Sequence, residues 1–322
     1  MIHARGLARS FTTRKGREKS EVHAVAGVDI DVEAGEIVGF LGPNGAGKTT
    51  TLRMLTTLLK PTAGSATVAG YDVATQPELV RQSIGYVSQA GSTQPEARAG
   101  EEVVDHGMLY GIPKAQATAR GKELFGQLEL DGLWERQPKA MSGGQRRRLD
   151  IAMGLVHDPQ LVFLDEPTTG LDPQARANLW THISGLRTER GMTVFLTTHY
   201  LDEADALCDR ILVIDHGEIV AADTPDALKG QVAGDLVELV VGDAAHAARA
   251  ATALSALAPG EAAAVDGTSV SLRVPGAGSR LPGLVRELDA AGVVLASIDV
   301  RRPTLDDVFL HLTGRSLRED AA

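Results

Sequence analysis

The order of hydrophobic and polar positions predicts buried strands that alternate with helices over the first two thirds of the chain. Apolar runs of strand length occupy residues 37–41, 161–166, 193–199 and 210–223. The last run carries a hairpin signal at His216–Gly217. Helical spacing follows Lys48 and dominates from about residue 95 to 157, whereas the charged segment 13–22 predicts an exposed loop. Strands separated by helices are typical of a mainly parallel sheet in an α/β domain.

The pattern changes near residue 225 and predicts a second, smaller domain. Strands and helices are expected in the order βαββαβα, at residues 235–241, 243–258, 262–266, 269–274, 279–291, 293–301 and from Thr304. The order βαββαβ is that of a ferredoxin-like α+β unit. We therefore expect a large domain at 1–225, which includes a helical subdomain at about 90–157, and a small α+β domain at 226–322.

A glycine-rich segment follows the strand at 37–41. It consists of Gly42, Pro43, Asn44, Gly45, Ala46, Gly47, Lys48, Thr49 and Thr50. It fits the P-loop pattern G-x-x-x-x-G-K-[ST] in the strand–loop–helix context that the pattern requires. Its glycines let successive backbone N–H groups surround a phosphate. Lys48 places a charge between the β- and γ-phosphates, and the Thr49 hydroxyl is a ligand for Mg²⁺.

An acidic pair ends the apolar strand at 161–166. Two adjacent carboxylates at the end of a buried strand are unfavourable unless a metal ion or an ordered water uses them. We expect Asp165 to reach Mg²⁺ through water, and Glu166 to polarise the water that attacks the phosphate. The pair and the P-loop together predict a P-loop ATPase, a class that kinases, helicases and motors share.

A second helix is predicted to begin at an anion-binding end. In the segment MSGGQRRRLDIA, residues 141–152, Ser142 is a good N-cap and two glycines leave backbone N–H groups bare. Apolar residues recur at helical spacing behind this end, at Leu149, Ala152, Met153 and Val156. We expect the three arginines at 146–148 to lie on the solvated face of this helix.

The order of the motifs resembles that of the nucleotide-binding domain of ABC ATPases over residues 1 to about 225. The motifs in chain order are Gln89 at a strand end, Ser142-Gly143-Gly144-Gln145, Asp165–Glu166, Asp172 in Gly-Leu-Asp, and His199. The resemblance implies a P-loop NTPase fold with a helical subdomain and N-terminal antiparallel strands. It also implies that two copies pair head to tail, with residues 142–145 of one chain on the ATP bound at Lys48 of the other.

The resemblance assigns further roles residue by residue. Gln89 is similar to the glutamine that senses Mg²⁺ and the membrane partner, Asp172 to the aspartate that links two sites, and His199 to the switch histidine on the γ-phosphate. Phe11 is the candidate for stacking on adenine, and the alternative is a core side chain. The expected catalytic residues are Lys48, Gln89, Glu166 and His199, and the expected Mg²⁺ ligands are Thr49, Gln89 and Asp165.

Composition and charge restrict the kinds of partner and the compartment that we expect for this chain. The net charge of −10 over 322 residues argues against nucleic acid, which requires a basic surface. The single cysteine, Cys208, cannot form an internal disulfide and fits a reducing compartment. No N-terminal segment resembles a signal peptide, and no apolar stretch approaches the ~20 residues of a membrane span. We expect a peripheral protein at the cytoplasmic face of the membrane.

The segment VRRPTLDDVFLHLTGR, residues 300–315, resembles the tail of drug-exporter ATPases of the daunorubicin/doxorubicin resistance type. This resemblance implies ATP-driven export of a hydrophobic compound through a separate transmembrane permease. The alternatives are export of a lipid, a polysaccharide or an ion, or a soluble ABC ATPase that acts on DNA or ribosomes. Within the segment, Thr304 and Asp307 fit a capping box, so a helix is expected to begin there.

Overall fold

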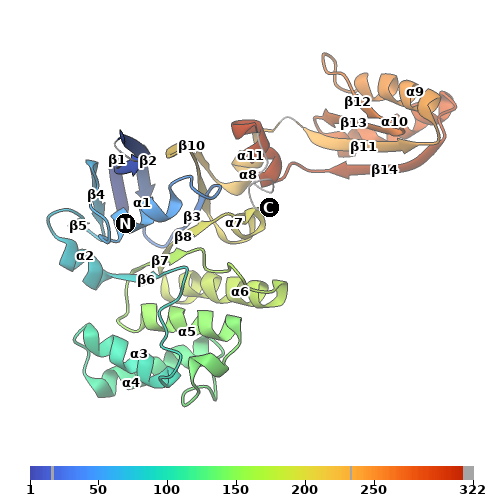
Figure 1. Ribbon diagram of the computed structural model, residues 1–322. Helices are drawn as coiled ribbons and strands as arrows, with labels where there is room; N and C mark the ends of the chain where they lie inside the picture. The colour runs from blue at the N-terminus through green and yellow to red at the C-terminus, as the bar shows by residue number, and fades with distance from the viewer. Residues whose placement is uncertain (16–17, 233, 315–322) are drawn as a thin grey trace. The chain divides into compact units, whose positions relative to one another are not determined.

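The computed structural model describes residues 1–15, 18–232 and 234–314, which form two compact units (Figure 1). The first unit holds the described residues up to Pro225, and the second holds those from Asp226 onward. Two sheets belong to the first unit and one sheet to the second. Each unit has a buried apolar core of its own.

The central sheet of the first unit has six strands in the order β10-β9-β3-β8-β7-β6. They are β3 (Ile37–Leu41), β6 (Ile84–Val87), β7 (Leu161–Asp165), β8 (Thr193–Thr198), β9 (Arg210–Asp215) and β10 (Glu218–Asp223). All neighbouring pairs are parallel except β9 with β10, which confirms the predicted α/β architecture. Because parallel strands end at one edge, the residues that follow β3, β6, β7 and β8 meet there.

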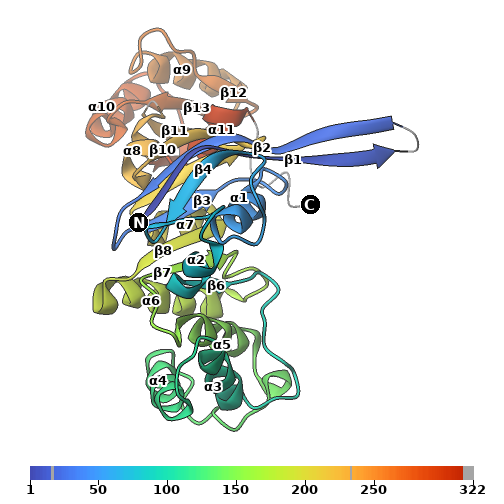
Figure 2. The same ribbon diagram turned by 90° about the vertical axis from the view of Figure 1, so that its left-hand side faces the viewer.

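A four-stranded antiparallel sheet, in the order β2-β1-β4-β5, forms the second sheet of this unit. Its strands are β1 (Ile2–Lys15), β2 (Glu18–Val32), β4 (Ala63–Val68) and β5 (Tyr71–Asp72). The loop expected at 13–22 is therefore wrong, since Thr13 pairs with Ser20 and Thr12 with Glu21 in a long hairpin (Figure 2). Strand pairing rests on backbone hydrogen bonds, which require no apolar pattern in the side chains.

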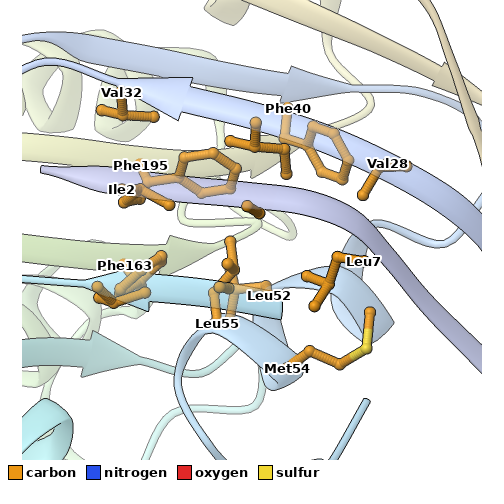
Figure 3. Close-up of a cluster of buried hydrophobic side chains, with 14 of the residues drawn as sticks. Ile2, Leu7, Val28, Val32, Phe40, Leu52, Met54, Leu55, Phe163 and Phe195 are labelled. Carbon is orange, nitrogen blue, oxygen red and sulfur yellow. The ribbon is translucent and has the colours of Figure 1, made fainter. Parts of the chain in front are cut away.

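Helix α1 (Lys48–Leu55) contacts strands of both sheets. Its buried Leu52 belongs to the same apolar cluster as Phe40, Phe163 and Phe195 (Figure 3). The ring centroid of Phe195 lies 5.7 Å from that of Phe40 and 5.7 Å from that of Phe163. Burial of side chains of this size stabilises a fold by about 1.5–3 kcal/mol each. The core thus fixes the helix whose first turn continues the glycine-rich loop.

Helices occupy the chain before β6, between β6 and β7, and after β7 and β8. They are α2 (Pro77–Ser83), α3 (Ala99–Leu109), α4 (Lys114–Gln127), a 3₁₀ turn (Pro138–Ala140), α5 (Gly143–Leu155), α6 (Pro173–Arg190) and α7 (Leu201–Leu207). Helix α5 contacts α3, α4, α6 and β6, and its Leu149, Ile151 and Ala152 are buried. These contacts fix the position of the Ser142 end of α5.

The sheet of the second unit has the order β12-β13-β11-β14, with every pair antiparallel. Helix α8 (Pro225–Gly230) begins at the last described residue of the first unit. The second unit then contains β11 (Asp235–Val241), α9 (Ala244–Ser255), β12 (Ala264–Asp266), β13 (Ser269–Val274), α10 (Ala277–Ala290) and β14 (Leu295–Arg301). Strand β13 lies between β11 and β12, which α9 connects, as in a split βαβ unit. The predicted order of strands and helices is confirmed.

The last described helix is α11 (Leu305–Thr313). Its capping box is confirmed, because the Asp307 amide donates to the Thr304 hydroxyl and the Thr304 amide donates to the Asp307 carboxylate. The helix ends at Gly314, whose φ of 74° is the left-handed conformation expected at such a stop. Leu305, Val308 and Phe309 are buried, and Asp307 also pairs with Arg273 of β13.

Candidate active site

The glycine-rich loop connects β3 to α1 at the carboxyl edge of the central sheet. Its last residue, Gly47, precedes α1 with a φ of 110°, a conformation that side chains disfavour. A Cβ at Gly47 would lie 2.6 Å from the carbonyl oxygen of Ala24, and one at Gly42 would lie 2.2 Å from that of Ile214. Glycine is therefore required at both positions. The α1 N-terminus has no capping side chain, which leaves its N–H groups for an anion.

Lys48 is buried at the base of this loop, with a side-chain exposure of 4%. Its ammonium donates to the carbonyl oxygens of Gly42 at 2.8 Å and Pro43 at 3.1 Å. The Nζ atom also lies 3.5 Å from Oε1 of Glu166. Burial lowers the pKa of Lys48, and the nearby carboxylate of Glu166 opposes that effect. Lys48, the predicted phosphate-binding residue, thus lies beside Glu166, the predicted general base.

Asp165 ends β7 and is 2% exposed. Its Oδ1 accepts hydrogen bonds from the hydroxyl of Thr197 at 2.6 Å and from that of Thr49 at 3.3 Å. A buried carboxylate in contact with a hydroxyl forms part of a hard oxygen donor set, which is what Mg²⁺ prefers beside phosphates. The two residues therefore fit the metal role that the sequence predicts for them.

Glu166 is the residue on which the other predicted catalytic groups converge. Its Oε2 accepts from Nε2 of Gln89 at 2.9 Å and lies 3.3 Å from Nδ1 of His199. Burial alone would raise the pKa of Glu166, but His199 and Lys48 outweigh it and lower that pKa to about 2. The structure thus brings Lys48, Gln89 and His199 to one carboxylate. Gln89 lies two residues beyond the end of β6, rather than on the strand.

The backbone at Glu166 is strained. Its φ of 43° places a non-glycine residue in the left-handed region. The Glu166 amide donates to the carbonyl oxygen of Thr197 at 3.1 Å and to its hydroxyl at 3.0 Å, so β8 holds this turn from one side. Thr197 is not among the residues predicted from the sequence, although a polar residue near the carboxyl end of a fully buried strand was a usable signal. Strain of this kind is typical of functional positions.

The second anion-binding end lies outside this cluster. Ser142 caps α5, as expected, and forms a reciprocal capping box with Gln145. A Cβ at Gly143 would lie 3.6 Å from Leu171, and one at Gly144 would lie 3.2 Å from Ala175. Within the part of the chain that the structure describes, no hydrogen bond or ion pair connects residues 142–145 to residues 42–50.

Two further predicted residues lie apart from the Glu166 cluster. Asp172 caps α6, because its Oδ1 accepts from the amide of Ala175 at 2.9 Å. Phe11 lies on β1 with 36% exposure, so the alternative of a core side chain is wrong. The Arg9 guanidinium lies 4.7 Å from the Phe11 ring centroid. The guanidinium lies over the ring in a cation–π contact, and the exposed part of the Phe11 side chain offers a surface on which a planar base can stack.

The expectation that all three arginines of α5 face solvent is wrong. Arg146 is exposed and Arg148 is half-buried, but Arg147 is only 7% exposed. Its guanidinium donates to the carbonyl oxygens of Ser88, Asp165 and Pro167. Three consecutive arginines give no indication of which one turns inward, so the sequence carried no signal for this contact.

Among the residues that the structure describes, no helix combines the length and the apolar character that a membrane crossing requires.

The chain is similar to known proteins over nearly all of its length. Residues 25–169 match the ABC transporter family. The daunorubicin resistance ATP-binding protein DrrA3 of Streptomyces coeruleorubidus is 41% identical over 97% of this chain and 98% of that protein. The doxorubicin resistance ATP-binding protein DrrA of Mycobacterium tuberculosis is 42% identical, over 93% and 91%. The linearmycin resistance ATP-binding protein LnrL of Bacillus subtilis is 36% identical, over 92% and 95%.

Solved structures resemble the first unit in particular. The dimeric ATP-binding cassette MJ0796 in a post-hydrolysis state with ADP and phosphate has a TM-score of 0.62 and 27% identity, over 70% of this chain and 98% of that one. The Glu166 cluster described above therefore lies in a fold similar to that of an ATP-binding cassette. The chain belongs to the ABC transporter family, together with the daunorubicin and doxorubicin resistance ATP-binding proteins, and is an ABC-type ATPase.

Proposed function

We propose that the chain hydrolyses ATP as a head-to-tail pair with a second copy of itself. The observation that carries this proposal is the separation of the two anion-binding helix ends. Lys48, Gln89 and His199 gather at Glu166, whereas Ser142 presents a capped helix end that forms no hydrogen bond or ion pair with that cluster within the described residues. A two-fold pair would place each Ser142 end opposite the other chain's loop. The resemblance to the dimeric cassette MJ0796 supports this pairing.

In this proposal Glu166 orients the attacking water and accepts its proton, and Gln89 and His199 hold that carboxylate in place. Lys48 and the N–H groups of the loop bind the β- and γ-phosphates. Thr49, Asp165 and Gln89 would hold Mg²⁺, and the bound ion would supply positive charge beside the transferred phosphoryl group. Asp172 contributes to the contact between the two chains, and Phe11 stacks on adenine.

The transport role rests on the relatives. Those named above confer resistance to daunorubicin, doxorubicin and linearmycin, and they match the chain well beyond the residues of the nucleotide site. We therefore propose ATP-driven efflux of a hydrophobic antibiotic-like compound through a separate permease, with this chain bound at the cytoplasmic membrane face. The residues from 226 onward form an accessory domain in this proposal. Export of a compound similar to a Nod factor is the second candidate, because a Nod factor export ATP-binding protein of Ralstonia nicotianae is 36% identical.

Reconstitution with the membrane protein encoded beside this chain tests the proposal. Both proteins are purified together, incorporated into vesicles and given ATP with daunorubicin, linearmycin or a Nod factor. We expect ATP-dependent transport of one of the first two and no transport with the Glu166→Gln chain. ATP hydrolysis without any binding to the membrane protein would contradict the transport role. Transport of the Nod factor alone would favour the second candidate.

A further inference from the structure

A buried arginine lies behind the candidate active site and has no role in the function proposed above. Arg147 is on the second turn of α5, and its three guanidinium nitrogens donate to three different carbonyl oxygens. Nε bonds Pro167 at 2.8 Å, Nη1 bonds Ser88 at 2.5 Å and Nη2 bonds Asp165 at 2.9 Å. Because the guanidinium is planar and rigid, three hydrogen bonds from its three nitrogens fix the spacing of the three carbonyl oxygens.

The three carbonyls belong to residues adjacent in sequence to Gln89 and Glu166. Asp165 and Pro167 are the residues on either side of Glu166, whose φ is 43°. Ser88 is the residue before Gln89, whose amide donates to Glu166 at 2.9 Å. The Arg147 side chain therefore holds the backbone on both sides of the strained turn at Glu166. It also holds the backbone at Ser88, directly before Gln89. Strained turns persist only where the surrounding structure holds them.

The electrostatic surroundings keep this guanidinium in place. Burial lowers the pKa of Arg147, and the carboxylates of Asp150 and Asp165 oppose that effect. Asp150, on the same helix, is itself fixed by the amide of Ser92 at 2.8 Å. An arginine stays charged under these conditions, so its bonds to the carbonyls are charge-assisted and strong.

We propose that Arg147 is a positioning residue for ATP hydrolysis, which holds Glu166 and Gln89 in their reactive arrangement from the helix that carries Ser142. The proposal rests on the function proposed above. Ser142 lies five residues before Arg147 on the same rigid segment. Arg147 thus connects the chain's own hydrolytic site to the helix end that serves the ATP of the other copy. Movement of that helix end displaces the backbone at Glu166 through a single side chain.

The test compares Arg147→Gln and Arg147→Lys with Arg146→Gln, all in the full-length chain. Arg146 is a matched control because it is exposed on the same helix and donates to a carbonyl of its own helix end, that of Met141. We expect Arg147→Gln to lower kcat about 30- to 100-fold, as a small misplacement of a reacting group does. Its Kd for a fluorescent ATP analogue should stay within about threefold of the wild-type value, because the glycine-rich loop is untouched. Arg147→Lys should lie in between, and Arg146→Gln should retain the wild-type kcat.

A double-mutant cycle with Gln89→Ala separates positioning from mere stability. If Arg147 acts through the Gln89–Glu166 pair, the double variant should be scarcely slower than the slower single variant. Losses that multiply, or an unchanged kcat in Arg147→Gln, would overturn the proposal. If Arg147→Gln does not fold, as judged by thermal unfolding, the cycle is run with Arg147→Lys. A wild-type chain that hydrolyses no ATP would refute the proposed function instead, so the two failures are distinguishable.

Discussion

Two helices of this chain begin at ends that are suited to anions, and the two ends are built differently. Helix α1 follows a glycine in the left-handed conformation and has no capping side chain, whereas α5 begins with a serine in a complete capping box. The end of α1 is surrounded by Lys48, Asp165 and Glu166, all of them buried. The end of α5 offers an exposed serine and two glycines. The end of α1 therefore brings charged side chains to an anion, whereas the end of α5 offers only a hydroxyl and backbone N–H groups.

The glycines of the two helix ends differ in how much space the chain leaves for a side chain. Gly42 and Gly47 are required by this chain's own backbone, because a Cβ at either would collide with a carbonyl oxygen. Gly143 meets only ordinary van der Waals distances, with the nearest atom at 3.6 Å. In the head-to-tail pair proposed above, the missing side chain of Gly143 leaves room for the phosphate bound by the other copy. In that proposal the α1 end belongs to a nearly complete site, and the α5 end is one half of the site on the other copy.

The largest expected effect comes from removing the base at the complete end. Glu166→Gln should lower kcat about 10³-fold, because an amide cannot accept the proton of the attacking water, while ATP binding remains. ATP-bound dimers should then accumulate, which size-exclusion chromatography with ATP and Mg²⁺ measures. Glu101→Gln is the control, since Glu101 is exposed on α3. A Glu166→Gln chain that turns over at the wild-type rate would exclude Glu166 as the base.

Complementation tests whether the two ends belong to one composite site. Ser142→Arg and Lys48→Ala should each lower ATPase activity roughly 10²-fold, because each removes one side of both sites in a homodimer. Mixed dimers contain one intact site, formed by the loop of the first variant and the helix end of the second. Equal mixing should restore about a quarter of the wild-type rate if the sites act independently. Full activity of Ser142→Arg alone would contradict the pairing.

Alanine substitutions at Gly42 and Gly143 should have different effects, one on the stability of the fold and the other on the rate of ATP hydrolysis. Gly42→Ala should lower the free energy of unfolding by about 2–3 kcal/mol, because its Cβ would lie 2.2 Å from a backbone oxygen. Gly143→Ala should change that free energy by less than about 1 kcal/mol, since alanine suits a helix. It should nevertheless lower kcat about tenfold by crowding the partner's phosphate. Urea unfolding and ATPase assays on both variants measure this, and equal losses of stability would refute the distinction.

What the sequence could predict here was local, and what it missed depended on contacts between distant segments. The spacing of Gly42, Gly47 and Lys48, and an acid pair after a buried strand, encode their chemistry within a few residues. The inward turn of Arg147 depends on carbonyls that lie 59, 18 and 20 residues away along the chain. The hairpin at 13–22 formed through backbone pairing, which leaves no mark on the pattern of side chains.

The smallest expected effect concerns the base of the nucleotide rather than its phosphates. Phe11→Ala should weaken ATP binding about fivefold to tenfold, because stacking on an aromatic ring contributes about 1–3 kcal/mol per base. The value of kcat at saturating ATP should not change, because stacking acts equally in the ground state and the transition state.

Val22→Ala is the matched control for this change, since Val22 pairs with Phe11 across the hairpin and is also exposed. It alters the same place on the strands without removing an aromatic ring, so its ATP affinity should stay near the wild-type value. Mg²⁺–tripolyphosphate should bind the Phe11→Ala chain as well as the wild type, because that ligand has phosphates but no base to stack. Equal weakening of ATP and tripolyphosphate would mean that Phe11 supports the glycine-rich loop instead of adenine. Unchanged ATP affinity would remove Phe11 from the site and leave recognition to the phosphate-binding end of α1.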